Sequence, residues 1–297
     1  MKDQLNIESR ILCIGEVLWD VLPDKKVPGG APMNVAYHLQ KLGLNVQFVS
    51  KIGDDELGDQ LKAYLNSLGK DFTFQIDKAH QTSIAEVDTS DPYELKYTFP
   101  TCAWDFLELT DDLRALANNS DILVYGSLVS RNRKSYETLL SLIKDETKYK
   151  VFDMNLRPPN YTREGIVKFL EEADMVKMNE SELDTLREWF YKNQEEEELL
   201  RKIWEDFNCK IITVTKGSEG ASLLYQDHYY VHPGFEAEVV DTIGAGDAFL
   251  AGFLYKLLAK DSPEDILSFA CAIGALVVTG EGAHLDYSID QIYASFL

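Results

Sequence analysis

The sequence lacks several features that would point to particular classes of protein. No apolar stretch approaches the ~20 residues that a membrane-spanning helix needs, and no apolar core with a cleavage-like tail follows the amino terminus, as it would in a secretory signal. Basic residues are few: 29 Lys and Arg stand against 50 Asp and Glu, for a net charge of -21. This balance argues against binding nucleic acid or anionic membranes through a basic face. We therefore expect a soluble, cytoplasmic protein.

Cysteine is also scarce, and its spacing excludes common metal and redox patterns. The four cysteines are widely separated, with no Cys-x-x-Cys pair, and each lies in or beside an apolar segment: Cys13, Cys102, Cys209 and Cys271. Such positions indicate reduced thiols in or near the core. There is no Gly-x-x-x-x-Gly-Lys-Ser/Thr, no Gly-x-Gly-x-x-Gly after the first strand, and no His/Cys cluster with metal-ligand spacing. These absences argue against a P-loop kinase and a dinucleotide oxidoreductase.

Short apolar runs alternate with longer amphipathic segments along most of the chain. The apolar runs predict buried strands at residues 10–15, 46–52, 122–125, 150–154, 175–178 and 211–215. Helical periodicity predicts helices at residues 34–42, 56–68, 135–143, 164–172, 181–190, 197–207, 245–259 and 263–279. This alternation predicts an α/β protein, with a three-layer α/β/α, doubly wound and mostly parallel sheet. We expect residues 1–297 to form one such domain.

Two segments break the alternation and predict additional strands. Residues 17–27 lie between the first strand and the first helix, and residues 82–99 carry two extended runs joined by Asp-Thr-Ser-Asp-Pro, which is a hairpin signal. Inserted strands have to pack against something, and a flap over the ligand edge of the sheet is one solution. We expect these segments to form a small β-sheet lid; a surface hairpin without function is the alternative.

The sharpest chemical signal is Asp-Thr-Ile-Gly-Ala-Gly-Asp at residues 241–247, directly before an apolar helix. Because Gly244, Ala245 and Gly246 are small, backbone N–H groups there can approach an anion, and the helix dipole favours negative charge. Asp247 would repel that anion, which makes sense if it also lies beside an attacking hydroxyl as a general base. A Gly-rich turn with Asp247 as a helix cap is the simpler interpretation.

A second group of polar residues predicts contacts to a polyol. Gly-Gly-Ala-Pro-Met-Asn at residues 29–34 leads into a predicted helix, where Gly30 permits close backbone approach and Asn34 can donate and accept hydrogen bonds. Asp20 follows the first strand, on the edge where doubly wound sheets bind ligands. A flexible turn with an Asn cap, and a solvent-facing Asp, are the alternatives.

These segments together resemble the paired signatures of the ribokinase-like carbohydrate kinases. The resemblance rests on Gly-Gly-x-x-x-Asn-x-Ala at residues 29–36 and on Asp-Thr-x-Gly-Ala-Gly-Asp-x-Phe-x-x-Gly at residues 241–252, and it spans nearly the whole chain. It implies that Asp247 is the base and that Gly244, Ala245 and Gly246 form the anion hole. It also implies a sugar site made of Asp20, Gly30 and Asn34.

The resemblance further implies ATP and Mg²⁺. Asn179 and Glu182 match an Asn-x-x-Glu element that supports magnesium and phosphate, with Glu182 acting mostly through water. Thr215 and Gly217 match a loop that contacts the nucleotide. Asp241 matches a residue that in some relatives helps to bind a monovalent cation, so K⁺ is a further candidate cofactor.

The same resemblance guides the choice of substrate. Asp-Met-Asn-Leu-Arg-Pro at residues 153–158 is similar to an element of fructokinases, in which Arg157 would contact the sugar or the phosphoryl group; a structural ion pair is the alternative. Two further motifs, Gly-Gly-Ala-Pro-x-Asn at residues 29–34 and Ala-Trp-Asp at residues 103–105, also favour fructokinase. Cys271 departs from the pattern, because many relatives carry Asn there near the adenine.

We therefore expect a kinase that transfers the γ-phosphoryl group of MgATP to a hydroxyl of a small sugar, with fructose as the expected substrate. A kinase for 2-keto-3-deoxygluconate, ribose or a nucleoside is the alternative within the class, and a non-catalytic sugar-binding regulator the alternative outside it. By resemblance, the lid is expected to form the contact of a homodimer.

Overall fold

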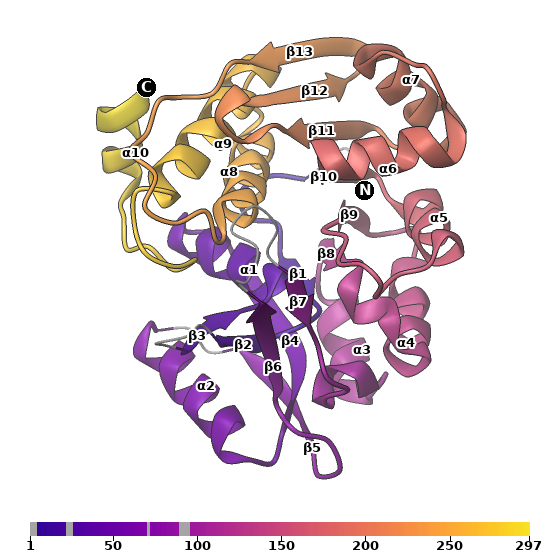
Figure 1. Ribbon diagram of the computed structural model, residues 1–297, viewed down its shortest axis with the longest axis vertical. Helices are drawn as coiled ribbons and strands as arrows, with labels where there is room; N and C mark the ends of the chain where they lie inside the picture. Colours follow the sequence, from indigo (N-terminus) through magenta and orange to yellow (C-terminus); the bar gives the residue numbers. More distant parts are fainter. Residues whose placement is uncertain (1–4, 22–25, 70–71, 89–95) are drawn as a thin grey trace.

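The computed structural model describes residues 5–21, 26–69, 72–88 and 96–297, and within them it has two β-sheets (Figure 1). The main sheet has nine strands in the order β13-β12-β11-β10-β9-β8-β1-β4-β5. Neighbouring strands from β5 to β11 are parallel, whereas β12 and β13 add to one edge in antiparallel fashion. The strands are β1 (Ile11–Ile14), β4 (Val46–Gly53), β5 (Thr73–Asp77), β8 (Ile122–Gly126), β9 (Tyr149–Asp153), β10 (Met175–Asn179), β11 (Ile211–Thr215), β12 (Ala221–Tyr225) and β13 (His228–His232).

Helices cover both faces of this sheet. Figure 1 shows α8 and α9 on one side and α4 and α5 on the other. The helices are α1 (Ala31–Lys41), α2 (Glu56–Ser67), α3 (Asp111–Asn118), α4 (Arg133–Ile143), α5 (Arg163–Glu172), α6 (Glu180–Phe190), α7 (Glu196–Phe207), α8 (Ala245–Ala259), α9 (Pro263–Val277) and α10 (Ile289–Phe296). The α/β architecture with a mostly parallel sheet, predicted from the alternation, is confirmed.

Two hydrophobic clusters fill the spaces between the sheet and its helices. In β1, Ile11 and Cys13 belong to the cluster beneath α1, α8 and α9, whereas Leu12 and Ile14 belong to the cluster beneath α4 to α7. Successive residues of a strand point to opposite faces, so a strand buried on both sides is apolar throughout. All four cysteines are buried and unpaired by disulfides, as predicted.

The small sheet consists of the segments that break the alternation. Its strands are β2 (Leu18–Val21), β3 (Lys26–Gly29), β6 (Ser83–Asp88) and β7 (Lys96–Thr98), in the order β3-β2-β6-β7. The hairpin predicted within residues 82–99 is confirmed by the antiparallel pairing of β6 with β7. Most of its turn, residues 89–95, lies outside the described residues.

Helix α1 begins earlier than its periodicity predicted. The sequence suggested a start at Asn34, but the helix starts at Ala31 with Gly30 as its N-cap. Pro32 suits the first turn because its fixed φ is helical and no intrahelical N–H is needed there. Asn34 is therefore a buried residue of the first turn, and the alternative in which it caps the helix is wrong.

Most residues of helix α8 are apolar, and the helix packs against both α1 and α9. Gly252 lets α8 and α9 approach closely, because a Cβ at this position would lie 2.6 Å from Cγ2 of Ile273. The packing holds the amino-terminal end of α8 beside that of α1. Among the described residues, no helix has the combined length and apolar character that crossing a membrane requires.

Asp55 links α2 to the small sheet, and its loss should destabilise the fold. Its carboxylate caps α2 through Gly58 N (2.8 Å) and accepts hydrogen bonds from the N–H (2.7 Å) and hydroxyl (2.7 Å) of Thr82. We expect Asp55→Ala to lower the free energy of unfolding by about 2 kcal/mol, measured by urea denaturation. Asp59→Ala, an exposed change on the same helix, should alter it little; equal effects of the two would refute the assignment.

Candidate active site

The carboxyl ends of the central parallel strands bring the predicted site residues to one edge of the sheet. Glu16 follows β1, Asp153 ends β9 and Asn179 ends β10. The register places Asp153 next to Lys177 and Asn179 next to Thr215 on adjacent strands. The amino-terminal ends of α1 and α8 meet at the same edge, because Asn34 of α1 contacts Asp247 of α8. Sites of doubly wound sheets form at this edge.

The start of α8 is a left-handed turn that only glycine fits. Gly244 is the N-cap with φ +78°, and a Cβ there would lie 2.5 Å from that of Ala283. Asp241 holds the turn by accepting hydrogen bonds from the N–H groups of Ile243 (3.0 Å) and Gly282 (2.9 Å). Asp247 is the third residue of the helix, so the alternative in which it is the cap is wrong.

The Asp247 side chain is partly buried and accepts a hydrogen bond from the side-chain amide of Asn34. Nδ2 of Asn34 donates to its Oδ2 at 2.8 Å. Burial raises the pKa of Asp247 to about 6, and Lys177, Asn34 and Arg157 limit the rise by favouring the ionised form. A carboxylate with such a pKa is suited to accept a proton near neutral pH.

A buried ion pair lies against the backbone at the start of α8. Lys177 Nζ is 2.9 Å from Asp153 Oδ1, and the Lys177 side chain is only 8% exposed. A Cβ at Gly246 would lie 3.1 Å from Nζ, so the ammonium group approaches the start of α8. Burial lowers the pKa of Lys177, but Asp153, Asp247 and Glu182 raise it to a net value above its ordinary one. The lysine therefore stays charged.

Sequence reasoning gave no role to Asp153, which lies in the predicted strand at residues 150–154. Lys177 stands in the otherwise apolar strand Met-Val-Lys-Met, and an unpaired lysine is rarely buried. A lysine within a predicted buried strand was therefore the one sequence feature that could have indicated a functional role for Lys177. The second oxygen of Asp153 is buried and has no hydrogen-bond partner within the described chain.

Glu182 is used by the protein itself. Asn179 and Glu182 form a capping box at the start of α6, in which Oε2 of Glu182 accepts from the Asn179 N–H at 2.9 Å. Oε1 accepts from the N–H of Leu156 at 2.7 Å, which ties α6 to the loop carrying Arg157. Burial raises the pKa of Glu182, and Lys177 opposes this effect. Both carboxylate oxygens of Glu182 thus accept hydrogen bonds from backbone N–H groups. A metal ion would therefore bind Glu182 through a water molecule or bind Asp153 instead.

The predicted sugar residues gather around one arginine. Arg157 lowers the pKa values of Asp20, Glu16 and Asp247. Burial outweighs this effect and raises the pKa of Asp20 to about 6 and that of Glu16 to about 7. Gly30 has φ +119°, and a Cβ there would lie 2.5 Å from the carbonyl oxygen of Glu16. Glycine is required because the backbone passes so close.

The predicted nucleotide residues lie beside this site, on the next strand. Thr215 ends β11, and Gly217 follows in a left-handed conformation with open space around it. Val239 and Val240, just before Asp241, are exposed apolar side chains. Lys216 pairs with Glu196 at 2.8 Å, so its charge is compensated within the protein. Cys271 of α9 is buried.

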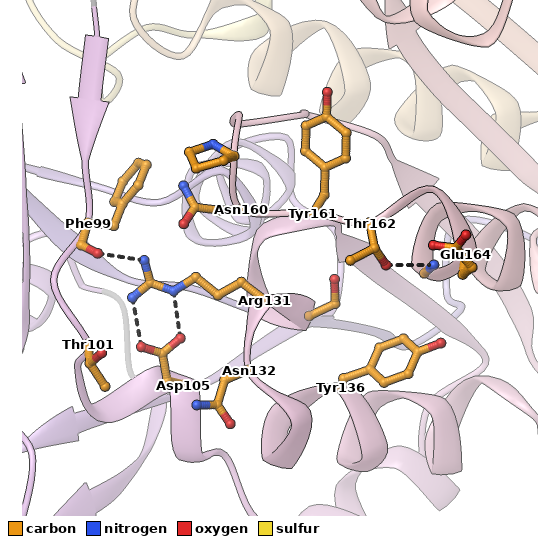
Figure 2. Close-up of a pocket in the computed structure, with 13 residues that line it drawn as sticks. Phe99, Thr101, Asp105, Arg131, Asn132, Tyr136, Asn160, Tyr161, Thr162 and Glu164 are labelled. Carbon is orange, nitrogen blue, oxygen red and sulfur yellow. Dashed lines mark hydrogen bonds and ion pairs between the residues drawn. The ribbon is translucent and has the colours of Figure 1, made fainter. Parts of the chain in front are cut away.

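A cavity of about 490 Å³ lies between the exit of β7 and the loops after β8 and β9 (Figure 2). Figure 2 shows Arg131 paired with Asp105 through Nε and Nη2, each at 2.7 Å. The guanidinium group also bonds the carbonyls of Phe99 and Pro100 and lies over the ring of Trp104. None of the predicted site residues lines this cavity.

The Ala-Trp-Asp motif at residues 103–105, which favoured fructokinase in the sequence, thus has a structural role. Trp104 and Asp105 belong to a 3₁₀ helix (Ala103–Phe106). Asp105 pairs with Arg131, which follows β8 at the end of a second 3₁₀ helix (Leu128–Arg131). Arg131 also donates to the carbonyl of Phe99, just after β7, and so connects the small sheet to the segment after β8. Among the described residues, no group of three or more His, Cys, Asp or Glu is arranged to hold a metal ion.

Comparisons with known proteins identify the family of the chain. The model of the pfkB family of carbohydrate kinases matches residues 8–290. A fructokinase of Escherichia coli is 30% identical over 298 residues, covering 93% of this chain and 95% of that protein.

Two solved structures are similar over nearly their full lengths. One is a fructokinase from Xylella fastidiosa with bound ATP (TM-score 0.84, 25% identity, 96% of this chain and 97% of that one). The other is a double mutant of fructokinase from Vibrio cholerae O395 with fructose, ADP and a potassium ion (TM-score 0.85, 27% identity, 98% and 99%). The extent of these matches and the site residues lead to one conclusion: the chain belongs to the pfkB family of carbohydrate kinases.

Proposed function

We propose that this ATP-dependent carbohydrate kinase is a fructokinase, which transfers the γ-phosphoryl group of MgATP to a hydroxyl of fructose. The observation that carries the proposal is Asp247, a carboxylate in the first turn of α8 that Asn34 contacts at 2.8 Å. This arrangement combines a base, a hydroxyl-binding amide and an anion-binding helix terminus. The relatives named fructokinase support the choice of sugar.

The charges around Arg157 favour a neutral sugar over an acidic one. Arg157 faces the carboxyl groups of Glu16, Asp20 and Asp247, so little of its positive charge is free to bind a substrate carboxylate. Those carboxylates can instead accept hydrogen bonds from vicinal hydroxyls. 2-Keto-3-deoxygluconate, which is ionised, suits such a site less well than fructose.

In the proposed mechanism, Asp247 removes the proton from the attacking hydroxyl. Oδ2 accepts from Asn34, which leaves Oδ1 for the hydroxyl proton. The N–H groups of Gly244, Ala245 and Gly246 would stabilise the charge on the transferring phosphoryl group, assisted by the dipole of α8. Lys177, charged and lying against Gly246, would add a fixed positive charge there.

The cofactors are proposed from the donor groups present. The unpartnered oxygen of Asp153 suits hydrated Mg²⁺, with Glu182 acting through water and through the backbone it holds. When bound, Mg²⁺ would neutralise the charge on the transferred phosphates. For K⁺, Asp241 would shape the surrounding loop through the N–H groups of Ile243 and Gly282. The potassium ion of the V. cholerae structure supports this proposal.

The nucleotide and the small sheet complete the proposal. Thr215 and Gly217 would contact ATP, and the exposed Val239 and Val240 would face its base. We propose that the small sheet, which carries Asp20 on β2, covers the sugar as a lid and forms the contact of a homodimer. Sedimentation velocity would reveal a monomer if the second part is wrong.

The substrate is tested by ADP release with MgATP and fructose, ribose, glucose, 2-keto-3-deoxygluconate or adenosine. We expect fructose to give the highest kcat/KM, and KCl to raise it above the value in tetramethylammonium chloride. Higher turnover of another sugar would reassign the substrate within the family. Sugar binding without turnover of any compound would favour the regulator.

Removal of the proposed base should abolish turnover while sparing binding. Asp247→Asn keeps the size of the side chain and an acceptor for Asn34, but it cannot take a proton. We expect kcat to fall by about 10²–10⁴, with the dissociation constant for fructose, from calorimetry, nearly unchanged. Asp184→Asn on the surface of α6 is the control. Near-normal kcat in Asp247→Asn would remove this residue from the mechanism.

The acid side of the pH profile should report the same carboxylate. Because Asp247 must be ionised to act as a base and its pKa is about 6, kcat/KM should fall as the pH drops through about 6. Asn34 stabilises the ionised form, so Asn34→Ala should move the acid limb to higher pH. An acid limb that moves to lower pH in Asn34→Ala, or stays in place, would contradict the proposal that Asn34 stabilises the ionised form of Asp247.

A further inference from the structure

His284, in the loop between α9 and α10, is hydrogen-bonded to the proposed active site. Its Nε2 lies 3.0 Å from Oδ1 of Asn34, and its Nδ1 lies 3.0 Å from the hydroxyl of Tyr64 on α2. Asn34 in turn reaches Asp247. A continuous series of hydrogen bonds therefore links four side chains in the order Tyr64, His284, Asn34 and Asp247. No local sequence pattern indicates this series of hydrogen bonds, because its members are far apart along the polypeptide.

The direction of each hydrogen bond follows from the last acceptor. An ionised Asp247 can only accept, so Asn34 presents its Nδ2 to it. The Oδ1 of Asn34 then accepts, and Nε2 of His284 must be the donor. In a neutral imidazole the other nitrogen, Nδ1, accepts, and the hydroxyl of Tyr64 donates to it. Each of the three hydrogen bonds thus joins one donor to one acceptor.

The imidazole is held firmly by its surroundings. The ring centroid of Tyr37 lies 4.6 Å from that of His284, and the Tyr37 hydroxyl bonds the carbonyls of His284 (3.3 Å) and Leu285 (3.2 Å). The preceding carbonyl, of Ala283, is 2.9 Å from Nε2 of His38. A donor fixed in this way orients its acceptor.

We propose that His284 is a positioning residue that selects the orientation of the Asn34 amide. Its Nε2–H holds Oδ1, so that one N–H of Asn34 faces Asp247 and the second is left for a sugar hydroxyl. Without this donor the amide can rotate, and an Oδ1 turned toward Asp247 would meet a like partial charge. The inference rests on the proposed roles of Asn34 and Asp247.

The test compares His284→Leu, which removes the donor, with His284→Gln, whose amide N–H can replace it. Loss of one partner of this partly buried hydrogen bond should lower kcat/KM for fructose by about tenfold in His284→Leu. The KM for fructose should rise while that for ATP is unchanged, and His284→Gln should recover most of the loss. His228→Leu, at an exposed histidine of β13, is the matched control.

A double-mutant cycle separates this role from a general structural one. If His284 acts through Asn34, His284→Leu should cause no further loss in an Asn34→Ala background. An equal loss in both backgrounds, or a KM change for both substrates, would overturn the inference. Should His284→Leu fail to fold, His284→Glu, which accepts but does not donate at pH 8, replaces it.

The outcomes also separate this inference from the proposed function. Wild-type kcat/KM in His284→Leu, together with large losses in Asn34→Ala and Asp247→Asn, would overturn only the role of His284. Normal activity in Asn34→Ala or Asp247→Asn would overturn the proposed site, and the inference with it.

Discussion

The hydrogen bond between Asn34 and Asp247 is the contact on which the arrangement of the site depends. It joins the first turns of α1 and α8, which are separated by most of the chain, at the carboxyl edge of the sheet. The packing of α8 between α1 and α9 makes this approach possible, and Gly252 permits the close contact of α8 with α9. The same contact lowers the cost of keeping an ionised carboxylate partly buried at a helix terminus that we propose also binds the transferring phosphoryl group.

The site concentrates negative charge and compensates it sparingly. Burial raises the pKa values of Glu16, Asp20 and Asp247, and the nearby positive charges are those of Arg157 and Lys177. Carboxylates held in this way make the folded state less stable than neutral side chains would, a common cost at functional sites. The gain is a set of acceptors ready for hydroxyl groups and protons near neutral pH.

Much of the fold and part of the site could be predicted from local patterns. The six predicted strands appear within a residue at each end, because strands buried on both faces are apolar throughout. The strands β5 and β13, at the two edges of the sheet, were not predicted, since they are partly exposed and lack that pattern. Strand β12, between β11 and β13, was not predicted either, although most of its residues are buried. The start of α1 was placed too late because a proline in the first turn hides the periodicity.

The sequence by itself determined the family and the glycine turn before α8, and it predicted the base, because these depend on short runs such as residues 241–252 in which spacing dictates backbone geometry. The tertiary structure alone decided which partners those residues meet. Lys177 pairs with Asp153 across adjacent strands, Arg131 attaches the small sheet, and His284 reaches Asn34 from the last loop. Such contacts join residues far apart in the chain, and no local pattern encodes which distant donor will come within hydrogen-bonding distance.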